Sequence, residues 1–122
     1  MSLADVHISH EPGALVARLV GEVDMSNAEE LGATVIGATP NQARGVVLDL
    51  TQVDYLDSAG IYVIHGMRAS LQARGQLLVL VIPPDSPVYD TLRLSGAERP
   101  GEVVEELDAG LAALEASASE DA

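Results

Sequence analysis

Two short apolar runs, separated by one helix-length segment, constrain the fold of this chain most. Residues 46–50 read VVLDL and residues 77–82 read LLVLVI. Nearly continuous apolar runs of this length are typical of strands that are covered on both faces. Between them, residues 58–74 carry apolar side chains at helical spacing, and Gly75 follows where a left-handed helix cap belongs. This order predicts a right-handed βαβ unit.

The chain before this unit predicts a hairpin and one more helix. Residues 6–8 and 15–20 read as two strands, and residues 11–13, Glu-Pro-Gly, have the composition of a turn. Ser26 and Glu29 have the spacing of a capping box, so a helix is expected to start at Ser26. The apolar face expected for this helix consists of Ala28, Leu31, Val35 and Ala38.

Three elements are expected after the second apolar run. Ser86 as N-cap and Pro87 at the first helical position predict a short helix that Gly96 ends. Residues 102–104 are predicted to form a short edge strand. The apolar residues expected to face the core are Val88, Leu92 and Leu94 in the short helix, and Leu107, Leu111 and Leu114 in a final helix.

The length of 122 residues predicts a single domain, residues 1–122, because single domains cluster at roughly 100–150 residues. We expect its core to span about residues 5–115. Residues 116–122 contain no large apolar side chain, so they are expected to form an acidic, frayed tail.

The net charge of −13 and the missing residue types exclude several functions. All six basic residues are arginine, so lysine-dependent phosphate loops and Schiff-base chemistry are absent. Without cysteine, disulfides and thiolate metal sites are excluded. The acidic charge and the lack of Phe and Trp disfavour direct binding of nucleic acid, and the charge disfavours anionic membranes. Because no signal peptide or membrane-spanning run is visible, we expect a cytoplasmic protein.

Three aspartates, Asp24, Asp49 and Asp57, are expected at or beyond strand ends or before helices. Ligands gather at this edge of open α/β sheets. A phosphoacceptor aspartate with Mg²⁺ would also need a lysine, which the chain lacks. The favoured interpretation is structural, with Asp24 and Asp57 as turn or cap residues and Asp49 at a rim. No metal site is expected from the scattered histidines His7, His10 and His65.

Residues 53–61, VDYLDSAGI, form the most informative segment. They join a predicted buried strand to the central helix, and either Asp57 or Ser58 has a side chain that can cap the first helical turn. Tyr55 and Leu56 place apolar side chains in a connection that is expected to be exposed. They either form a docking surface for a partner or fold back over the core, and their position alone favours neither.

Ser58 has two open interpretations. Position alone favours a helix cap, the commoner use of serine at a helix start. The other is a phosphorylation site, where a phosphate adds roughly −1.5 to −2 charge beside Asp57. The helix dipole tolerates that charge, but an apolar or acidic partner does not, so affinity would change without unfolding. A nucleophilic role with His65 as base is excluded, since the two residues would lie about 10 Å apart along the helix.

Four features occur in an order that identifies a family. They are Gly21-Glu22-Val23-Asp24, Val46-Val47-Leu48-Asp49-Leu50-Thr51 with Val53, Asp57-Ser58-Ala59-Gly60, and the later Val88, Leu92, Leu94 and Gly96. With these features the chain resembles, over about residues 6–114, the STAS domain of bacterial anti-sigma factor antagonists. The resemblance implies an α/β fold with a four- to five-stranded mixed sheet and about four helices packed mainly on one face.

The resemblance also implies a function. In such proteins the serine that matches Ser58 is phosphorylated by an anti-sigma factor that is itself a serine kinase. The unphosphorylated antagonist binds that kinase and frees a sigma factor, and a phosphatase resets the switch. Ser58 is then the phosphoacceptor and Asp57 orients it. The implied partner contacts are Asp24, Thr51, Tyr55, Leu56, Asp57, Ile61 and Tyr62.

We therefore expect a binding module that is not an enzyme, needs no cofactor, and is a monomer or weak dimer. A second hypothesis keeps the STAS fold and assigns the chain to a lipid or anion transport system, or to the sensing of a ligand or nucleotide. The absence of a membrane-spanning run counts against the transporter, and the missing phosphate loop and lysines count against nucleotide sensing.

Overall fold

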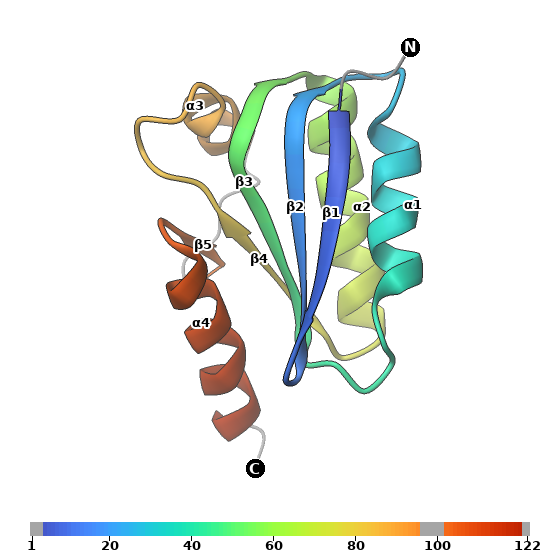
Figure 1. The fold of residues 1–122 in the computed structure, drawn as a ribbon, viewed down its shortest axis with the longest axis vertical. Coiled ribbons are helices and arrows are strands. Elements are labelled where there is room, and N and C mark those ends of the chain that lie inside the picture. Colours follow the sequence, from blue (N-terminus) through green and yellow to red (C-terminus); the bar gives the residue numbers. More distant parts are fainter. Residues whose placement is uncertain (1–3, 96–101, 121–122) are drawn as a thin grey trace.

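The computed structural model describes residues 4–95 and 102–120 of the chain. Within these residues, five strands form one mixed sheet in the order β1-β2-β3-β4-β5, accompanied by four helices (Figure 1). This confirms the expected α/β fold. The elements are β1 (Ala4–Glu11), β2 (Ala14–Val23), α1 (Ala28–Ala38), β3 (Gly45–Leu56), α2 (Ser58–Ala73), β4 (Leu77–Val81), α3 (Tyr89–Leu94), β5 (Val103–Val104) and α4 (Leu107–Glu120).

The hairpin and the βαβ unit are both confirmed. β1 and β2 pair antiparallel, whereas β2 with β3, β3 with β4, and β4 with β5 pair parallel. Gly75, after α2, has a φ of +72°, the left-handed conformation that was expected there. Each of these parallel connections leads to the neighbouring strand, always in the same direction across the sheet. Crossover connections that share one handedness therefore place their helices on the same face of the sheet.

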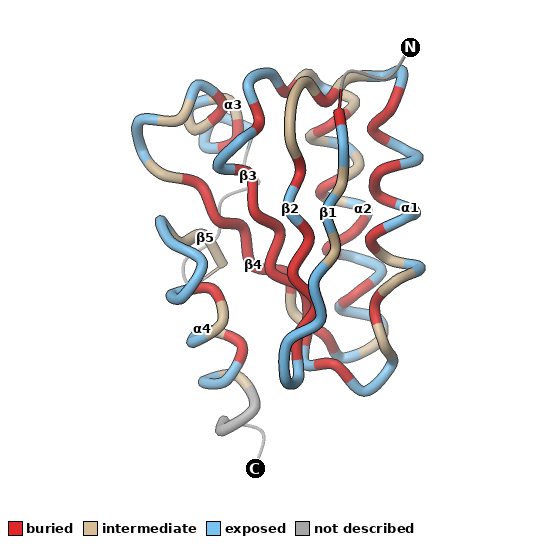
Figure 2. The backbone as a smooth tube through the Cα atoms, in the orientation of Figure 1, coloured by how far each residue is buried: buried red, intermediate tan, exposed pale blue. Residues whose placement is uncertain are grey.

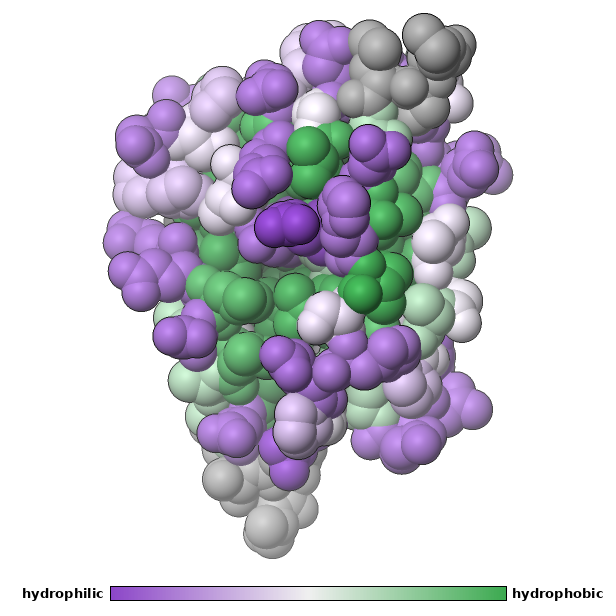
Figure 3. Space-filling view, viewed as in Figure 1, coloured by the Kyte–Doolittle hydropathy of each residue, from purple (hydrophilic) through white to green (hydrophobic). Residues whose placement is uncertain are grey.

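Helices cover the two faces of the sheet unequally. Residues of α1, α2 and α3 join one core cluster with strand residues such as Leu48 and Leu80. The alternate strand residues Val47 and Val79 pack on the opposite face with Leu114 of α4. The helices therefore lie mainly on one face, as expected. Figure 2 shows the central strands buried, and Figure 3 shows hydrophobic surface beside α4, flanked by hydrophilic side chains.

Strand β3 is longer than predicted, because the apolar run ends at Leu50 and the strand continues to Leu56. Its register with β2 shifts twice between Arg18 and Glu22 of β2. Each shift adds one residue to β3, as β-bulges do. The core-facing residues of this part are therefore three apart, at Leu50, Val53 and Leu56, and the alternation typical of a strand is lost.

The predicted starts of two helices were wrong. α1 begins at Ala28 after Asn27, and Ser26 donates its hydroxyl to Asp24, so no capping box forms with Glu29. α3 begins at Tyr89, although the Ser86 hydroxyl oxygen does accept a hydrogen bond of 3.3 Å from the Val88 backbone N–H.

Three further corrections concern the C-terminal part. Leu94 is 82% exposed, so it does not face the core as predicted, and the expected helix end at Gly96 lies outside the described residues. α4 continues to Glu120, which contradicts a tail that begins at residue 116. In α4, Leu114 is fully buried and Leu111 is half-buried, as predicted. Leu107, at the start of the helix, is 37% exposed and does not face the core as expected.

Candidate functional site

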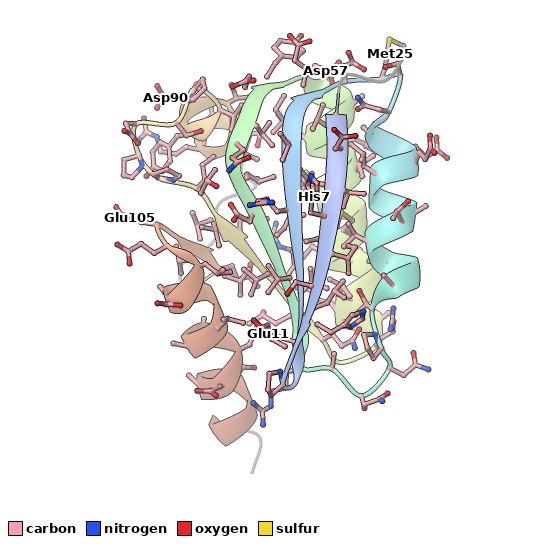
Figure 4. The ribbon with its side chains drawn as sticks, viewed as in Figure 1. His7, Glu11, Met25, Asp57, Asp90 and Glu105 are labelled. Carbon is pink, nitrogen blue, oxygen red and sulfur yellow. The ribbon has the colours of Figure 1, made fainter. Side chains whose placement is uncertain are left out.

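The parallel register of β2 and β3 builds the candidate site. Val23 and Leu56, the last residues of the two strands, lie opposite each other. The Asp57 backbone N–H donates a 3.3 Å hydrogen bond to the Val23 carbonyl oxygen. Asp24 and Asp57 therefore leave the same edge of the sheet, and α1 and α2 begin beside each other. Figure 4 shows Met25 and Asp57 at this end of the molecule.

Asp57, rather than Ser58, caps helix α2. The Asp57 carboxylate accepts a 3.1 Å hydrogen bond from the Gly60 backbone N–H, and its carbonyl oxygen accepts one from the Ile61 N–H. Ser58 is the first residue of the helix and is exposed. Within the described residues its hydroxyl makes no hydrogen bond to the protein. The helix-cap interpretation of Ser58 is therefore wrong, and its hydroxyl is accessible.

Removal of this cap should affect stability without a large loss of structure. We expect Asp57→Ala to lower the free energy of unfolding by about 1 kcal/mol, because one orphan backbone N–H loses its acceptor. Asp57→Asn keeps a capping oxygen and should lose much less. Urea unfolding of both variants measures the difference. Equal losses in the two variants would contradict the capping role.

Asp24 forms the turn that leads into α1. Its carboxylate accepts hydrogen bonds from the Ser26 hydroxyl and from the Ser26 backbone N–H, the latter at 2.9 Å. These two bonds lower the pKa of Asp24 below its ordinary value of 3.8. The buried Asn27 side chain fixes the turn by accepting from the Asp24 N–H and donating to the Glu22 carbonyl oxygen. The turn thus holds an ionised carboxylate just before the start of α1.

The pKa of Asp24 provides a pH test of this turn. A carboxyl whose pKa is lowered in the folded state stabilises the protein above the unfolded value of 3.8, and this contribution is lost as the pH falls through the lowered pKa. We expect Ser26→Ala to raise the pKa of Asp24, as measured by NMR titration of the carboxyl carbon. Ser9→Ala, on distant β1, should leave it unchanged. An unaltered value in Ser26→Ala would contradict the assignment.

An open groove of about 590 Å³ lies between the starts of the two helices. Two large apolar side chains at the groove are strongly exposed, with Met25 at 85% and Tyr62 at 79%. Ser58 and Asp57 also line it, so the hydroxyl of Ser58 lies beside an apolar surface. The complete lining is Met25, Ala28, Glu29, Asp57, Ser58, Ala59, Tyr62 and Val63.

The structure separates the other predicted contact residues. Tyr55 and Leu56 end strand β3, where Tyr55 is 50% exposed and Leu56 is 4% exposed. Leu56 is therefore a core residue, and only Tyr55 offers surface to a partner. Ile61 is half-buried against the core. Thr51 lies within β3 and donates its hydroxyl to Asp49 at 2.7 Å, away from the lining of the groove at Ser58.

Asp49 also differs from its predicted place. It lies inside β3 and is only 9% exposed, whereas the sequence placed it at a strand end. Its carboxylate accepts hydrogen bonds from both the backbone N–H and the hydroxyl of Thr51.

The structural interpretation of Asp24 and Asp57 as turn and cap residues is confirmed. Among the described residues, no cluster of three or more His, Asp or Glu side chains is arranged to hold a metal ion.

The sequence did not reveal three residues of this edge. They are Met25 and Glu29, which line the groove, and Asn27, which fixes the turn before α1. Met25 carried a usable signal, since a large apolar residue stands between Asp24 and Ser26 in a polar turn. The role of Asn27 had no usable signal in the sequence, because its hydrogen-bond partners depend on the folded path of the turn.

In the described part of the chain, no helix is both long enough and apolar enough to span a membrane.

Comparison with known proteins decides the family. The family described as "Mlab, STAS domain" matches residues 6–107. The chain belongs to the STAS domain family. BtrV of Bordetella bronchiseptica, provisionally named an anti-sigma factor antagonist, is 36% identical over 85 residues, 69% of this chain and 72% of BtrV. An anti-sigma F factor antagonist of Paenibacillus polymyxa is 30% identical over 93 residues, 75% of this chain and 78% of that protein.

Solved structures agree with this STAS fold. An anti-sigma factor antagonist from Mycobacterium paratuberculosis has a TM-score of 0.76 at 21% identity, with 92% of this chain and 94% of the other covered. A sulfate transporter family protein from Wolinella succinogenes has a TM-score of 0.74 at 20% identity, with 88% of each chain covered. At such identities the two structures show the common fold, not a common function.

Proposed function

We propose that this STAS domain is a phospho-switched anti-sigma factor antagonist. In its unphosphorylated form it binds an anti-sigma factor that is a serine kinase, and the sigma factor held by that kinase is released. Phosphorylation of Ser58 ends the interaction, and a phosphatase that acts on phospho-Ser58 restores it. The chain itself performs no catalysis in this scheme.

The accessible hydroxyl of Ser58 carries the proposal. Asp57 caps α2, so Ser58 is free of a structural role and lies at the rim of an open groove. The names of the two relatives at 36% and 30% identity support an anti-sigma factor as the partner. Met25 and Tyr62 supply the exposed apolar surface that a protein partner would cover.

Phosphorylation would act on the complex more than on the fold. In the free domain, the phosphate sits in the first turn of α2, where the helix dipole and free backbone N–H groups favour negative charge. In the complex, the same dianion would have to leave water beside the negative charge of Asp57, at a cost that the apolar contacts do not offset. We therefore expect phosphorylation to release the domain from the anti-sigma factor without unfolding it.

Displacement of a sigma factor tests the proposal. A purified anti-sigma factor kinase from the same organism is bound to its fluorescently labelled sigma factor, and this protein is added without ATP. We expect the anisotropy of the label to fall as the sigma factor is freed. If neither displacement nor binding occurs with any such kinase of the organism, the proposal is wrong and a STAS function in transport or sensing takes its place.

A further inference from the structure

We infer that the groove between α1 and α2 is the docking channel for a single amphipathic helix of the anti-sigma factor. The cationic residues of that helix face α1, and its uncharged side faces α2. This inference rests on the proposed function and extends its contact surface beyond Ser58.

A second groove continues from the one at Ser58. It has a volume of about 430 Å³, lies between α1 and α2, and reaches Ser70. The two grooves share Glu29, Tyr62 and Val63, so together they form one channel from Ser58 to Ser70. At 1.5 Å per helical residue, this stretch of α2 is about 18 Å long, enough for roughly three turns of a docked helix. The second groove is lined by Glu29, Gly32, Ala33, Ile36, Tyr62, Val63, Gly66, Met67 and Ser70.

The shape of the channel suits a helix. α1 and α2 approach closely, since a Cβ on Gly32 of α1 would lie 2.5 Å from Val63 Cγ1 of α2. Both helices run along the same face of the sheet (Figure 1). Two adjacent helices leave a groove that accepts a third helix by ridge-into-groove packing. A Cβ on Gly66 would meet no atom within 4 Å, so the wall is low and open there.

The charges of the two walls differ, and this difference orients the partner. Glu29, in the first turn of α1, is the charged residue among those lining the second groove. Along the second groove, the lining residues from α2 are all uncharged, and the buried Arg68 contacts Glu102 at 3.3 Å instead. Asp57, the N-cap of α2, lines only the first groove. A partner helix with lysine or arginine on one flank complements this pattern. A phosphate on Ser58 would add its charge to that of Asp57 at the start of α2, where the partner helix presents its uncharged flank.

Filling the groove tests the channel. We expect Gly66→Trp to weaken binding of the anti-sigma factor kinase by about tenfold or more, equal to roughly 1.4 kcal/mol. Gly37→Trp is the matched control, since Gly37 is an exposed glycine of α1 that does not line the groove and has open space around it. This control should bind within about twofold of the wild type. Circular dichroism and thermal unfolding establish that both variants are folded, and replacing a helical glycine favours the helix.

Charge reversal tests the orientation. Glu29→Lys should weaken binding at least threefold more than Glu30→Lys, which removes a neighbouring first-turn acid that does not line the groove. If Gly66→Trp and Glu29→Lys bind like their controls while Ser58→Asp fails to bind, the channel is wrong and the proposed function stands. If none of these variants, including Ser58→Asp, alters binding, the proposed function fails as well.

Discussion

The Ser58→Asp variant is expected to bind the anti-sigma factor kinase about 100-fold more weakly than the wild type, a loss of roughly 2.7 kcal/mol. The new carboxylate lies at the rim of the groove beside the exposed Met25 and Tyr62 side chains. A partner that covers these side chains must remove water from the new carboxylate, and the residues that line the groove include no cation to compensate for it. The fold should persist, because an acid in the first helical turn interacts favourably with the helix dipole.

Two variants separate this effect from a general effect of charge. Ser9→Asp introduces the same charge on β1, away from the site, and should bind as the wild type does. Ser58→Ala should keep its affinity and resist switching by ATP. Isothermal titration calorimetry gives the affinities and differential scanning calorimetry gives the melting temperatures. Undiminished binding by Ser58→Asp would contradict the switch, and a collapse of its melting temperature would instead indicate a structural role for Ser58.

Glu102→Leu is expected to cause the largest loss of stability, about 3 kcal/mol in the free energy of unfolding. Arg68 of α2 is 2% exposed, and its Nε lies 3.3 Å from an Oε atom of Glu102, whose side chain is 13% exposed. The pair ties α2 to the residue that precedes β5. When the carboxylate is removed, the guanidinium stays buried without that countercharge, and buried charges are costly when a partner is deleted.

The double variant Arg68→Met, Glu102→Leu is the control for this prediction. It removes both charges and leaves apolar side chains of similar size, so most of the stability should return. Guanidinium-induced unfolding monitored by circular dichroism measures both variants. A single variant that is no less stable than the double variant would show that burial of the Arg68 guanidinium does not depend on Glu102, which would contradict this prediction.

The buried βαβ unit was predictable from the sequence because its signals are local. Strands β3 and β4 are covered on both faces, so their apolar runs are nearly continuous at residues 46–50 and 77–82. The second half of β3 was not predictable in this way. Its two register shifts put Leu50, Val53 and Leu56 on the same face, and a pattern with spacing of three does not read as a strand.

Helix starts were predicted less well, because several nearby residues can accept the first backbone N–H groups. Ser26 has the spacing of a capping box with Glu29, yet Asp24 competes for its hydroxyl and the helix begins at Ala28. At α2 the sequence allowed Asp57 or Ser58 as the cap, and only the folded path selects Asp57. The selection matters for function, since it leaves the hydroxyl of Ser58 accessible.

The candidate site was predictable as a segment but not as a surface. Asp57 and Ser58 follow from local sequence and family resemblance. The groove beside them depends on the pairing of Val23 with Leu56, which brings the starts of α1 and α2 together. No local pattern predicts that Tyr55 turns outward while Leu56 turns into the core, because the second bulge of β3 sets their directions.

The most direct test of the phospho-switch uses the modified protein itself. The domain is incubated with ATP and the anti-sigma factor kinase, and intact-mass analysis follows the product, with Ser58→Ala as the control. We expect one phosphate on the wild type and none on the variant. The purified phosphoprotein should then bind the nucleotide-free kinase at least about 100-fold more weakly than the unmodified domain. Phosphorylation at another residue, or equal affinity of the two forms, would contradict the account.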